Sequence, residues 1–292
     1  MKTSNKVENT LLTALLACGL VACTSQETNP NTGSNGGTTA PAATGGVSGG
    51  GTTSSGGSSA TSSTDATTAE GKLCLPPAQA MITDFTPGAT ETTQVHFGNS
   101  TTLGGGQYVY PAAGGTVTYP LTSDVTGGNW HISGTVGDYS GFGLYWDNCK
   151  RVDASKYKGI SFKISGTVEQ DGMVTFEIST LKDTISAAWL NGHGVTGASD
   201  PGTCTPPADA TLNQYSQTTC AEPKVSIPVT ANPTTQTILW SDFTGGKPEA
   251  NVTASDILSI HWIFPNPNGI LSGTPTPYKA DIIIDDLSFV EK

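Results

Sequence analysis

The chain has 292 residues, a formal net charge of −11 at pH 7, 36 glycines and only 13% charged residues. This Gly-rich, charge-poor composition is typical of an extracellular β-protein with a flexible tether rather than of a helical cytosolic enzyme. A chain this acidic repels phosphate backbones and anionic lipid surfaces, which argues against nucleic acid as a partner.

The first 22 residues have the pattern of an export signal, in which two lysines precede the apolar stretch Leu11–Ala22. That stretch is too short to cross a bilayer as a helix. It ends in Leu20-Val21-Ala22-Cys23, which resembles the lipobox of bacterial lipoproteins. The resemblance implies that residues 1–22 are a lipoprotein signal peptide and that Cys23 becomes the lipidated N-terminus. An ordinary secretory signal is the alternative.

Thr24, and not Asp, follows this cysteine. In the familiar bacterial sorting pattern, that implies a location at the outer membrane or cell surface, with the protein facing the extracellular or the periplasmic side. A second match to the lipobox, Leu15-Leu16-Ala17-Cys18, leaves a hydrophobic region that is too short for a signal peptide.

Residues 23–73 are mostly Ser, Thr, Gly, Asn and Ala, with almost no large apolar side chain. Such a segment cannot bury enough surface to offset the entropy of ordering it, so we expect a disordered tether. The remaining residues, 74–292, are long enough for a single domain with a sizeable core, and we expect a monomer.

Residues 74–292 contain short runs with the period of two that half-buried strands show. In one of them Phe142, Leu144 and Trp146 alternate with Gly143 and Tyr145. The expected strands are Thr116–Tyr119, Trp130–Thr135, Gly141–Trp146, Gly159–Ser165, Val174–Ser179, Thr235–Leu239, Leu258–Phe264 and Asp281–Val290. Their number and spacing predict an all-β fold, a two-sheet β-sandwich or jelly roll.

Four cysteines lie in this domain, which in an exported protein indicates two disulfides with three possible pairings. We favour Cys204–Cys220, because that bond closes a polar, Pro-rich loop that would otherwise be floppy. Cys74–Cys149 then follows by elimination. A zinc site is the alternative, but the sequence has no Cys-x-x-Cys and its four histidines are scattered.

Several segments together carry a resemblance to a known type of domain: Ile82-Thr83-Asp84-Phe85, Tyr139-Ser140-Gly141-Phe142-Gly143-Leu144, Val152-Asp153-Ala154-Ser155, Tyr157-Lys158-Gly159-Ile160-Ser161-Phe162, the Cys204–Cys220 loop, Leu239-Trp240-Ser241-Asp242-Phe243, Ile260-His261-Trp262-Ile263-Phe264-Pro265 and Ile284-Asp285-Asp286-Leu287-Ser288-Phe289. Together they resemble secreted bacterial carbohydrate-binding-module-like domains of the galactose-binding-like jelly-roll type. The resemblance covers nearly all of residues 74–292. It implies the fold more strongly than the ligand, because this fold hosts many functions.

Jelly rolls of the resembled type often hold a structural calcium ion. The oxygens of Asp84, near the first strand, and Asp285, in the last, are suitable ligands if they meet at a sheet edge. Thr86 stands where the opening motif usually has Glu, which weakens this expectation. The alternative is that Asp285 and Asp286 only interrupt or cap the final strand.

Strand alternation also predicts which side chains point away from the core. We expect one concave sheet to present His131, Tyr145, Lys163, Glu177 and His261, which would bind sugar by ring stacking and hydrogen bonds. Trp189 would form a wall of this site together with His193. The alternatives are solvent-facing strand residues from two different sheets and a Trp189 buried as a loop anchor.

The sequence has no Gly-x-Ser-x-Gly elbow and no His-Glu-x-x-His motif, and the spacing of its acidic residues pairs no two carboxylates. We therefore expect a non-catalytic domain that binds a polysaccharide or oligosaccharide. Two alternatives stay open: a glycan-active hydrolase that uses Glu177, and a structural or adhesive envelope protein. A second carboxylate close to Glu177 in a deep cleft would favour the hydrolase.

Overall fold

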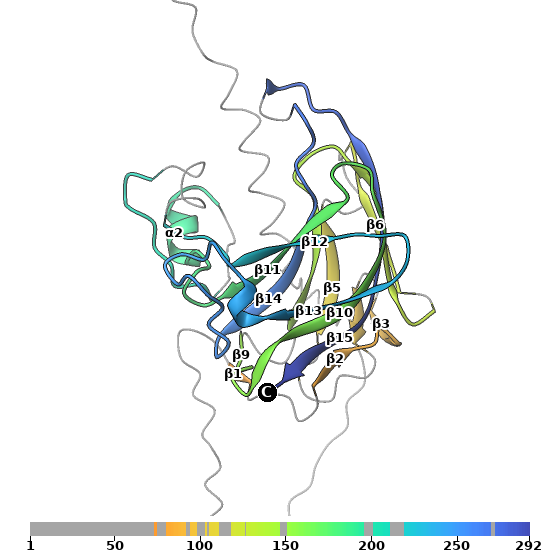
Figure 1. Cartoon of the computed structure of the whole chain (residues 1–292). Coiled ribbons are helices and arrows are strands. Elements are labelled where there is room, and N and C mark those ends of the chain that lie inside the picture. Colours follow the sequence, from red (N-terminus) through yellow and green to blue (C-terminus); the bar gives the residue numbers. More distant parts are fainter. Residues whose placement is uncertain are drawn as a thin grey trace, which may run out of the picture. The chain divides into compact units, whose positions relative to one another are not determined.

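The computed structural model describes residues 73–74, 80–91, 94–97, 103, 105–110, 118–125, 127–146, 151–195, 201–210, 219–269 and 272–292. Their secondary structure is almost entirely β, arranged as two sheets that form a sandwich (Figure 1). The predicted signal peptide, Cys23 and nearly all of the predicted tether lie outside the described residues. Within the described residues, no helix is long and apolar enough to cross a membrane.

The larger sheet has nine described strands. Along its main path lie, in order, β12 (Lys224–Pro228), β11 (Met173–Thr180), β14 (Ile257–Ile263), β8 (Gly141–Trp146), β5 (Gly105–Tyr110), β4 (Gln94–Phe97) and β3 (Pro87–Glu91). Two short strands, β9 (Arg151–Val152) and β1 (Leu73–Cys74), extend the sheet beside one end of β14. The strands of the main path pair antiparallel, and antiparallel sheets commonly have one face in the core and the other in solvent.

The smaller sheet has six described strands in the order β13 (Thr234–Leu239), β10 (Tyr157–Val168), β15 (Tyr278–Glu291), β7 (Trp130–Val136) and β6 (Leu121–Asp124), with β2 (Met81–Thr83) also pairing with β15. The long strands β10 and β15 pair antiparallel through most of their length. They form the centre of this second layer (Figure 1).

Aromatic rings from both sheets fill the core between them. The indole of Trp262 in β14 stacks on Phe142 of the same sheet, with ring centroids 5.3 Å apart. It also meets Phe162 and Trp130 of the opposite sheet edge-on, at 5.2 and 6.2 Å. Because these rings are fully buried and contact one another across the two layers, they fix which side of each strand faces inward.

Seven of the eight predicted strands are confirmed, most within a residue or two at either end. The exception is Thr116–Tyr119, where residues 118 and 119 form a bend and residues 116 and 117 lie outside the described part of the chain. The sequence prediction missed β2, β5, β6, β9 and β12 among the strands with described side chains. Strand β5 begins with glycines and β12 ends in a proline, and both residues lower the strand signal of a sequence.

Between β11 and β12 the chain forms a small lobe that contains helix α2 (Ala187–Gly192). The predicted disulfide Cys204–Cys220 is confirmed there, with the two Cα atoms 5.9 Å apart. The disulfide packs with Trp189 and Leu190 in a second, separate apolar cluster. The predicted Cys74–Cys149 bond is not tested, because Cys149 lies outside the described residues.

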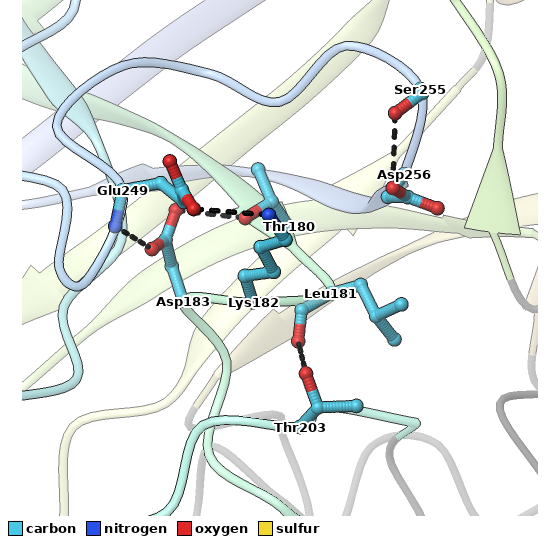
Figure 2. Close-up of polar contacts among 8 residues, drawn as sticks. All are labelled: Thr180, Leu181, Lys182, Asp183, Thr203, Glu249, Ser255 and Asp256. Carbon is cyan, nitrogen blue, oxygen red and sulfur yellow. Dashed lines mark hydrogen bonds and ion pairs between the residues drawn. The ribbon is translucent and has the colours of Figure 1, made fainter.

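Polar contacts at the end of β11 fix the start of this lobe (Figure 2). The carboxylate of Asp183, only 1% exposed, accepts hydrogen bonds from the Thr180 hydroxyl at 2.8 Å and from the backbone N–H of Glu249 at 3.0 Å. The hydroxyl of Thr203 donates to the backbone carbonyl of Leu181 at 3.0 Å. The lobe is therefore held at both its beginning and its middle, which determines where its last residues return to the sheet.

Candidate functional site

The outward face of the larger sheet carries one continuous row of side chains across five strands. The strand register places Tyr108 opposite Gly143, Gly143 opposite His261, His261 opposite Glu177, and Glu177 opposite Lys224. These positions alternate with core residues such as Phe142 and Ile260, so all five point away from the core. His261 and Glu177, which lie 84 residues apart in the chain, thus become cross-strand neighbours.

Three tyrosines on this face lie over glycines of the neighbouring strand. A Cβ atom added at Gly143 would lie 2.6 Å from the Tyr108 hydroxyl, and one added at Gly106 would lie 2.5 Å from the Tyr145 hydroxyl. The Tyr110 ring covers Gly141 in the same way. Any larger residue at these positions would displace the rings, so the glycines allow the tyrosines to lie across the sheet rather than stand upright on it.

With Tyr139, these residues form a continuous aromatic surface that we call the tyrosine row (Tyr145, Tyr108, Tyr110 and Tyr139). The ring centroids of Tyr145 and Tyr108 are 6.5 Å apart, those of Tyr108 and Tyr110 are 6.2 Å apart, and those of Tyr110 and Tyr139 are 5.5 Å apart. Tyr110 is buried, while the other three keep part of their surface exposed. The row therefore presents an extended surface of aromatic rings that is partly exposed to solvent, with phenol oxygens at its edges.

A chain of hydrogen bonds runs from the tyrosine row into the sheet through His261. Its Nδ1 atom lies 2.9 Å from the Tyr108 hydroxyl, and its Nε2 atom lies 2.8 Å from Ser179 Oγ and 2.6 Å from Ser259 Oγ. The Ser179 hydroxyl donates to Glu222 Oε1 at 2.7 Å. Since Ser179 has a single proton, it accepts from Nε2–H of the imidazole, and Nδ1 is left to accept from Tyr108.

The chain of hydrogen bonds ends at the carboxyl group of Glu222, whose charge acts on the neighbouring carboxyl group of Glu177. Burial, and then the charge of Glu222, raise the pKa of Glu177 to about 8, against the opposing effect of Lys224. At neutral pH Glu177 therefore keeps its proton. Glu222 comes from the lobe, two residues after Cys220, and its position depends on how the lobe is anchored.

Three of the sequence-predicted site residues, Tyr145, Glu177 and His261, lie together on this face. The prediction that His131 and Lys163 lie in the same sheet as the other three is wrong, because their strands β7 and β10 belong to the smaller sheet. His131 lies 3.0 Å from Asp281 and Lys163 pairs with Asp286, both on β15. A period of two tells which side of a strand is polar, but not in which of two sheets the strand lies.

Trp189 belongs to the core of the lobe and does not form a wall of this face. It is only 8% exposed, and its indole stacks on the imidazole of His193 with the ring centroids 3.8 Å apart. The hydroxyl of Ser186 caps helix α2 by accepting from the backbone N–H of Trp189. The alternative interpretation, a buried loop anchor, matches this arrangement.

The two predicted calcium ligands lie on neighbouring strands, since Thr83, next to Asp84, pairs with Leu287 of β15. Each carboxylate already accepts a local backbone hydrogen bond, Asp84 from Thr86 and Asp285 from its neighbour Asp286. In the part of the chain that the structure describes, no three His, Cys, Asp or Glu side chains are grouped to hold a metal ion. Two carboxylates fall short of the six to eight oxygens that calcium prefers, so calcium stays a prediction.

The sequence prediction missed Tyr108, Tyr110, Tyr139, Ser179 and Glu222. A signal for two of the tyrosines was available, since Tyr108 and Tyr110 alternate with other residues after a glycine run. Gly141 and Gly143 alternate in the same manner. Glu222 has no such signal, because it reaches the face from a loop.

The paired sheets make the domain a two-sheet β-sandwich of the jelly-roll class, as the sequence predicted. No family model and no curated protein matches the chain. Among solved structures, it is similar to a family 11 carbohydrate-binding module of a cellulosomal cellulase of Clostridium thermocellum, with 16% identity and a TM-score of 0.40 over 74% of this chain and 96% of the module. A family 11 module from the same organism, in complex with a β-1,3-1,4-mixed-linked tetrasaccharide, gives 17% identity and a TM-score of 0.37 over 64% and 88%. An exo-β-agarase gives 10% identity and a TM-score of 0.37 over 73% of this chain and 25% of the agarase.

Proposed function

We propose that this chain is a lipid-anchored protein of the outer membrane or cell surface whose β-sandwich binds polysaccharide without cleaving it. The observation that supports this function most directly is the tyrosine row, whose rings lie across the glycines of the neighbouring strand. Aromatic rings bind the apolar C–H faces of sugar rings, and a row of several rings matches several successive sugars better than a single one.

The groups beside the row match the hydroxyls of a sugar. The Tyr108 phenol, the imidazole of His261 and the hydroxyl of Ser259 are connected to one another, so each is held in a fixed orientation. Glu177 stays partly exposed at the end of the same network. Preorganised donors and acceptors beside apolar surface are what an uncharged, hydroxyl-rich ligand requires, since little ordering entropy is lost when it binds.

The arrangement of the carboxyl groups supports binding rather than hydrolysis. In most glycoside hydrolases the two carboxyl groups flank the scissile bond and lie about 5 to 9.5 Å apart, which leaves room for the sugar or a water molecule between them. Glu222 instead accepts a hydrogen bond from Ser179, which lies two residues from Glu177 on the same strand, and its charge raises the pKa of Glu177. The two carboxyl groups therefore lie next to each other on one face of the sheet.

Two sequence features support the proposed lipid anchor, the lipobox-like Leu20-Val21-Ala22-Cys23 and the Ser/Thr/Gly-rich residues 23–73. A lipidated Cys23 would hold the chain at the membrane, and the tether would give the domain reach to glycans nearby.

The test is a polysaccharide binding panel with the chain from residue 24 onward, read by affinity electrophoresis and by calorimetry. The panel includes mixed-linkage β-glucan, cellulose derivatives, xyloglucan, mannan, agarose and several acidic polysaccharides. We expect saturable binding to at least one of them and no release of reducing ends. Absence of binding throughout the panel would refute the proposed function, and release of reducing ends would favour the hydrolase.

A further inference from the structure

Two serines on neighbouring strands share one nitrogen of His261. Ser179 of β11 lies opposite Ser259 of β14, and their Oγ atoms are 2.8 and 2.6 Å from His261 Nε2. Ser179 is only 3% exposed, whereas Ser259 is partly exposed on the outward face. Of the two hydroxyl groups, only that of Ser259 is therefore within reach of a bound ligand.

The direction of the Ser179 hydrogen bond is set by Glu222, which reaches the sheet from the lobe. Glu222 Oε1 accepts hydrogen bonds from the hydroxyls of Ser179 at 2.7 Å and of Thr184 at 3.4 Å. A serine hydroxyl has one proton, so Ser179 can only accept at its contact with His261. The proton between Ser179 and His261 therefore belongs to Nε2, and this selects one of the two tautomers of the neutral imidazole.

The same tautomer decides what the Ser259 hydroxyl can do. Because Nε2 carries a proton, Ser259 Oγ can only accept from it, and the proton of Ser259 points elsewhere. Within the residues that the structure describes, the Ser259 hydroxyl has no second hydrogen-bond partner. On the other side of the ring, Nδ1 accepts the proton of the Tyr108 phenol. Ser259 thus contributes a hydrogen-bond donor to this face.

We propose that Ser259 is a specificity-determining residue that donates its hydroxyl proton to an oxygen of the bound glycan, and that Glu222 is the positioning residue that makes it a donor. This inference rests on the proposed glycan-binding function. Without Glu222, the Ser179 hydroxyl could donate to Nε2, and the imidazole could carry its proton on Nδ1 instead. Ser259 would then be able to direct its own proton to Nε2, away from the ligand.

The first experiment measures affinity by calorimetry with the glycan that binds best in the panel. Ser259→Ala should weaken binding about three- to ten-fold, which corresponds to the loss of one hydrogen bond. Ser259→Thr keeps a hydroxyl group and should retain most of the affinity. Ser133→Ala is the matched control and should bind like the wild type, because Ser133 is a partly exposed outward serine on β7 of the smaller sheet.

Variants of Glu222 test the positioning role. Glu222→Ala should weaken binding when Ser259 is present and have little further effect in Ser259→Ala, because the donor that Glu222 orients is then already absent. Glu222→Gln retains an oxygen that accepts from Ser179, so its affinity should stay close to that of the wild type. A purely structural role of Glu222 would instead make the two losses additive. Far-UV circular dichroism checks the fold of each variant.

Nitrogen NMR of the imidazole reads the tautomer directly and needs no ligand. At about pH 8, where an ordinary imidazole is neutral, we expect the proton of His261 on Nε2 in the wild type and in Glu222→Gln. Glu222→Ala should show a mixture of the two tautomers. A His261→Gln variant identifies the signals of this ring among those of the four histidines.

Three results would each overturn the proposal and leave the glycan-binding function standing: wild-type affinity in Ser259→Ala, additive losses in the double variant, or a proton on Nδ1 of His261 in the wild type. If Glu222→Ala does not fold, Ser259→Ala and the wild-type tautomer still decide the proposal. If no polysaccharide binds, the proposed function itself fails, and the donor role of Ser259 fails with it.

Discussion

The Tyr108 hydroxyl and His261 Nδ1 lie 2.9 Å apart, although 153 residues separate them in the sequence. Strand β8 lies between their two strands, and at the position between them it has Gly143. Because this glycine has no side chain, the Tyr108 ring reaches across a whole strand to the imidazole. The glycine thus joins the aromatic part of the face to its hydrogen-bonded part.

We expect Tyr108→Ala to weaken glycan binding by about ten-fold or more, because it removes a central ring of the tyrosine row. Tyr108→Phe keeps the ring and loses only the hydrogen bond to His261, so its loss should be smaller. Calorimetry with the best glycan of the panel measures both. Tyr119→Ala is the matched control, since Tyr119 also covers a glycine, Gly137, but lies before β6 of the smaller sheet. A loss as large for Tyr119→Ala would contradict the assignment of the site.

Gly143→Ala should reduce both binding and stability. The new methyl group would lie 2.6 Å from the Tyr108 hydroxyl and 2.7 Å from the backbone oxygen of Ile260, so the ring and the backbone both have to move. Overpacking of this kind costs about 1–3 kcal/mol of unfolding free energy. Urea denaturation measures that loss. Gly192→Ala serves as the control, because an added Cβ there meets nothing within 4 Å. Wild-type stability and affinity in Gly143→Ala would show that the ring does not depend on this glycine.

The stability of the domain should depend on pH through Glu177. In the unfolded chain this carboxyl group loses its proton near the usual glutamate pKa of 4.5, whereas in the folded state it keeps it up to a pKa of about 8. Between these values the folded state binds more protons, so the contribution of Glu177 to the free energy of unfolding decreases as the pH rises. The slope reaches at most about 1.4 kcal/mol per pH unit and vanishes above the folded pKa.

Glu177→Gln should remove this slope, because glutamine donates to Glu222 without holding a titratable proton. Urea denaturation at several pH values between 5 and 9 gives the slope for the wild type and the variant. Glu291→Gln should behave like the wild type. Equal slopes in the wild type and in Glu177→Gln would show that Glu177 does not keep its proton in the folded state.

Loss of the disulfide in Cys204→Ser/Cys220→Ser should lower the free energy of unfolding by about 3 kcal/mol, since the bond closes a loop of 16 residues. Glycan binding should also weaken, because Glu222 lies two residues after Cys220 and is positioned by the lobe. Urea denaturation and calorimetry with the best glycan of the panel measure these effects. Unchanged glycan binding in a destabilised variant would mean that the disulfide does not position Glu222.

Cys23→Ser should abolish lipid attachment and release the protein from the membrane fraction. Incorporation of a radiolabelled fatty acid, followed by membrane fractionation, measures both. Cys18→Ser is the control for the second lipobox-like match and should leave lipidation intact. If Cys18→Ser abolishes lipidation and Cys23→Ser does not, the cleavage site lies at the earlier match.

Most of the sandwich could be predicted from local patterns. The run from Phe142 to Trp146 shows its inward and outward sides by alternation alone, and the structure agrees residue for residue. The disulfide Cys204–Cys220 followed from the need to close a polar loop. Strand β5 was missed, because its glycines have low strand propensity although they are essential to the face.

The candidate site could be predicted only in part. Tyr145, Glu177 and His261 were placed on one face, as the structure has them, because each occupies an outward position of a recognisable strand. His131 and Lys163 occupy equally good outward positions, yet they lie in the smaller sheet. Glu222 completes the carboxyl pair from the end of a loop, where no periodicity exists to predict its direction.

The amino-acid sequence by itself determined the β-rich fold, the polar side of each strand, the loop disulfide and the lipobox-like start, because these depend on neighbours close in the chain. Only the tertiary structure decided which strands pair, and therefore which outward residues meet. Strand order and register are set by the packing of both sheets around rings such as Trp262, and that packing depends on contacts between residues far apart in the sequence. The tyrosine row and the Glu177–Glu222 pair are products of that order.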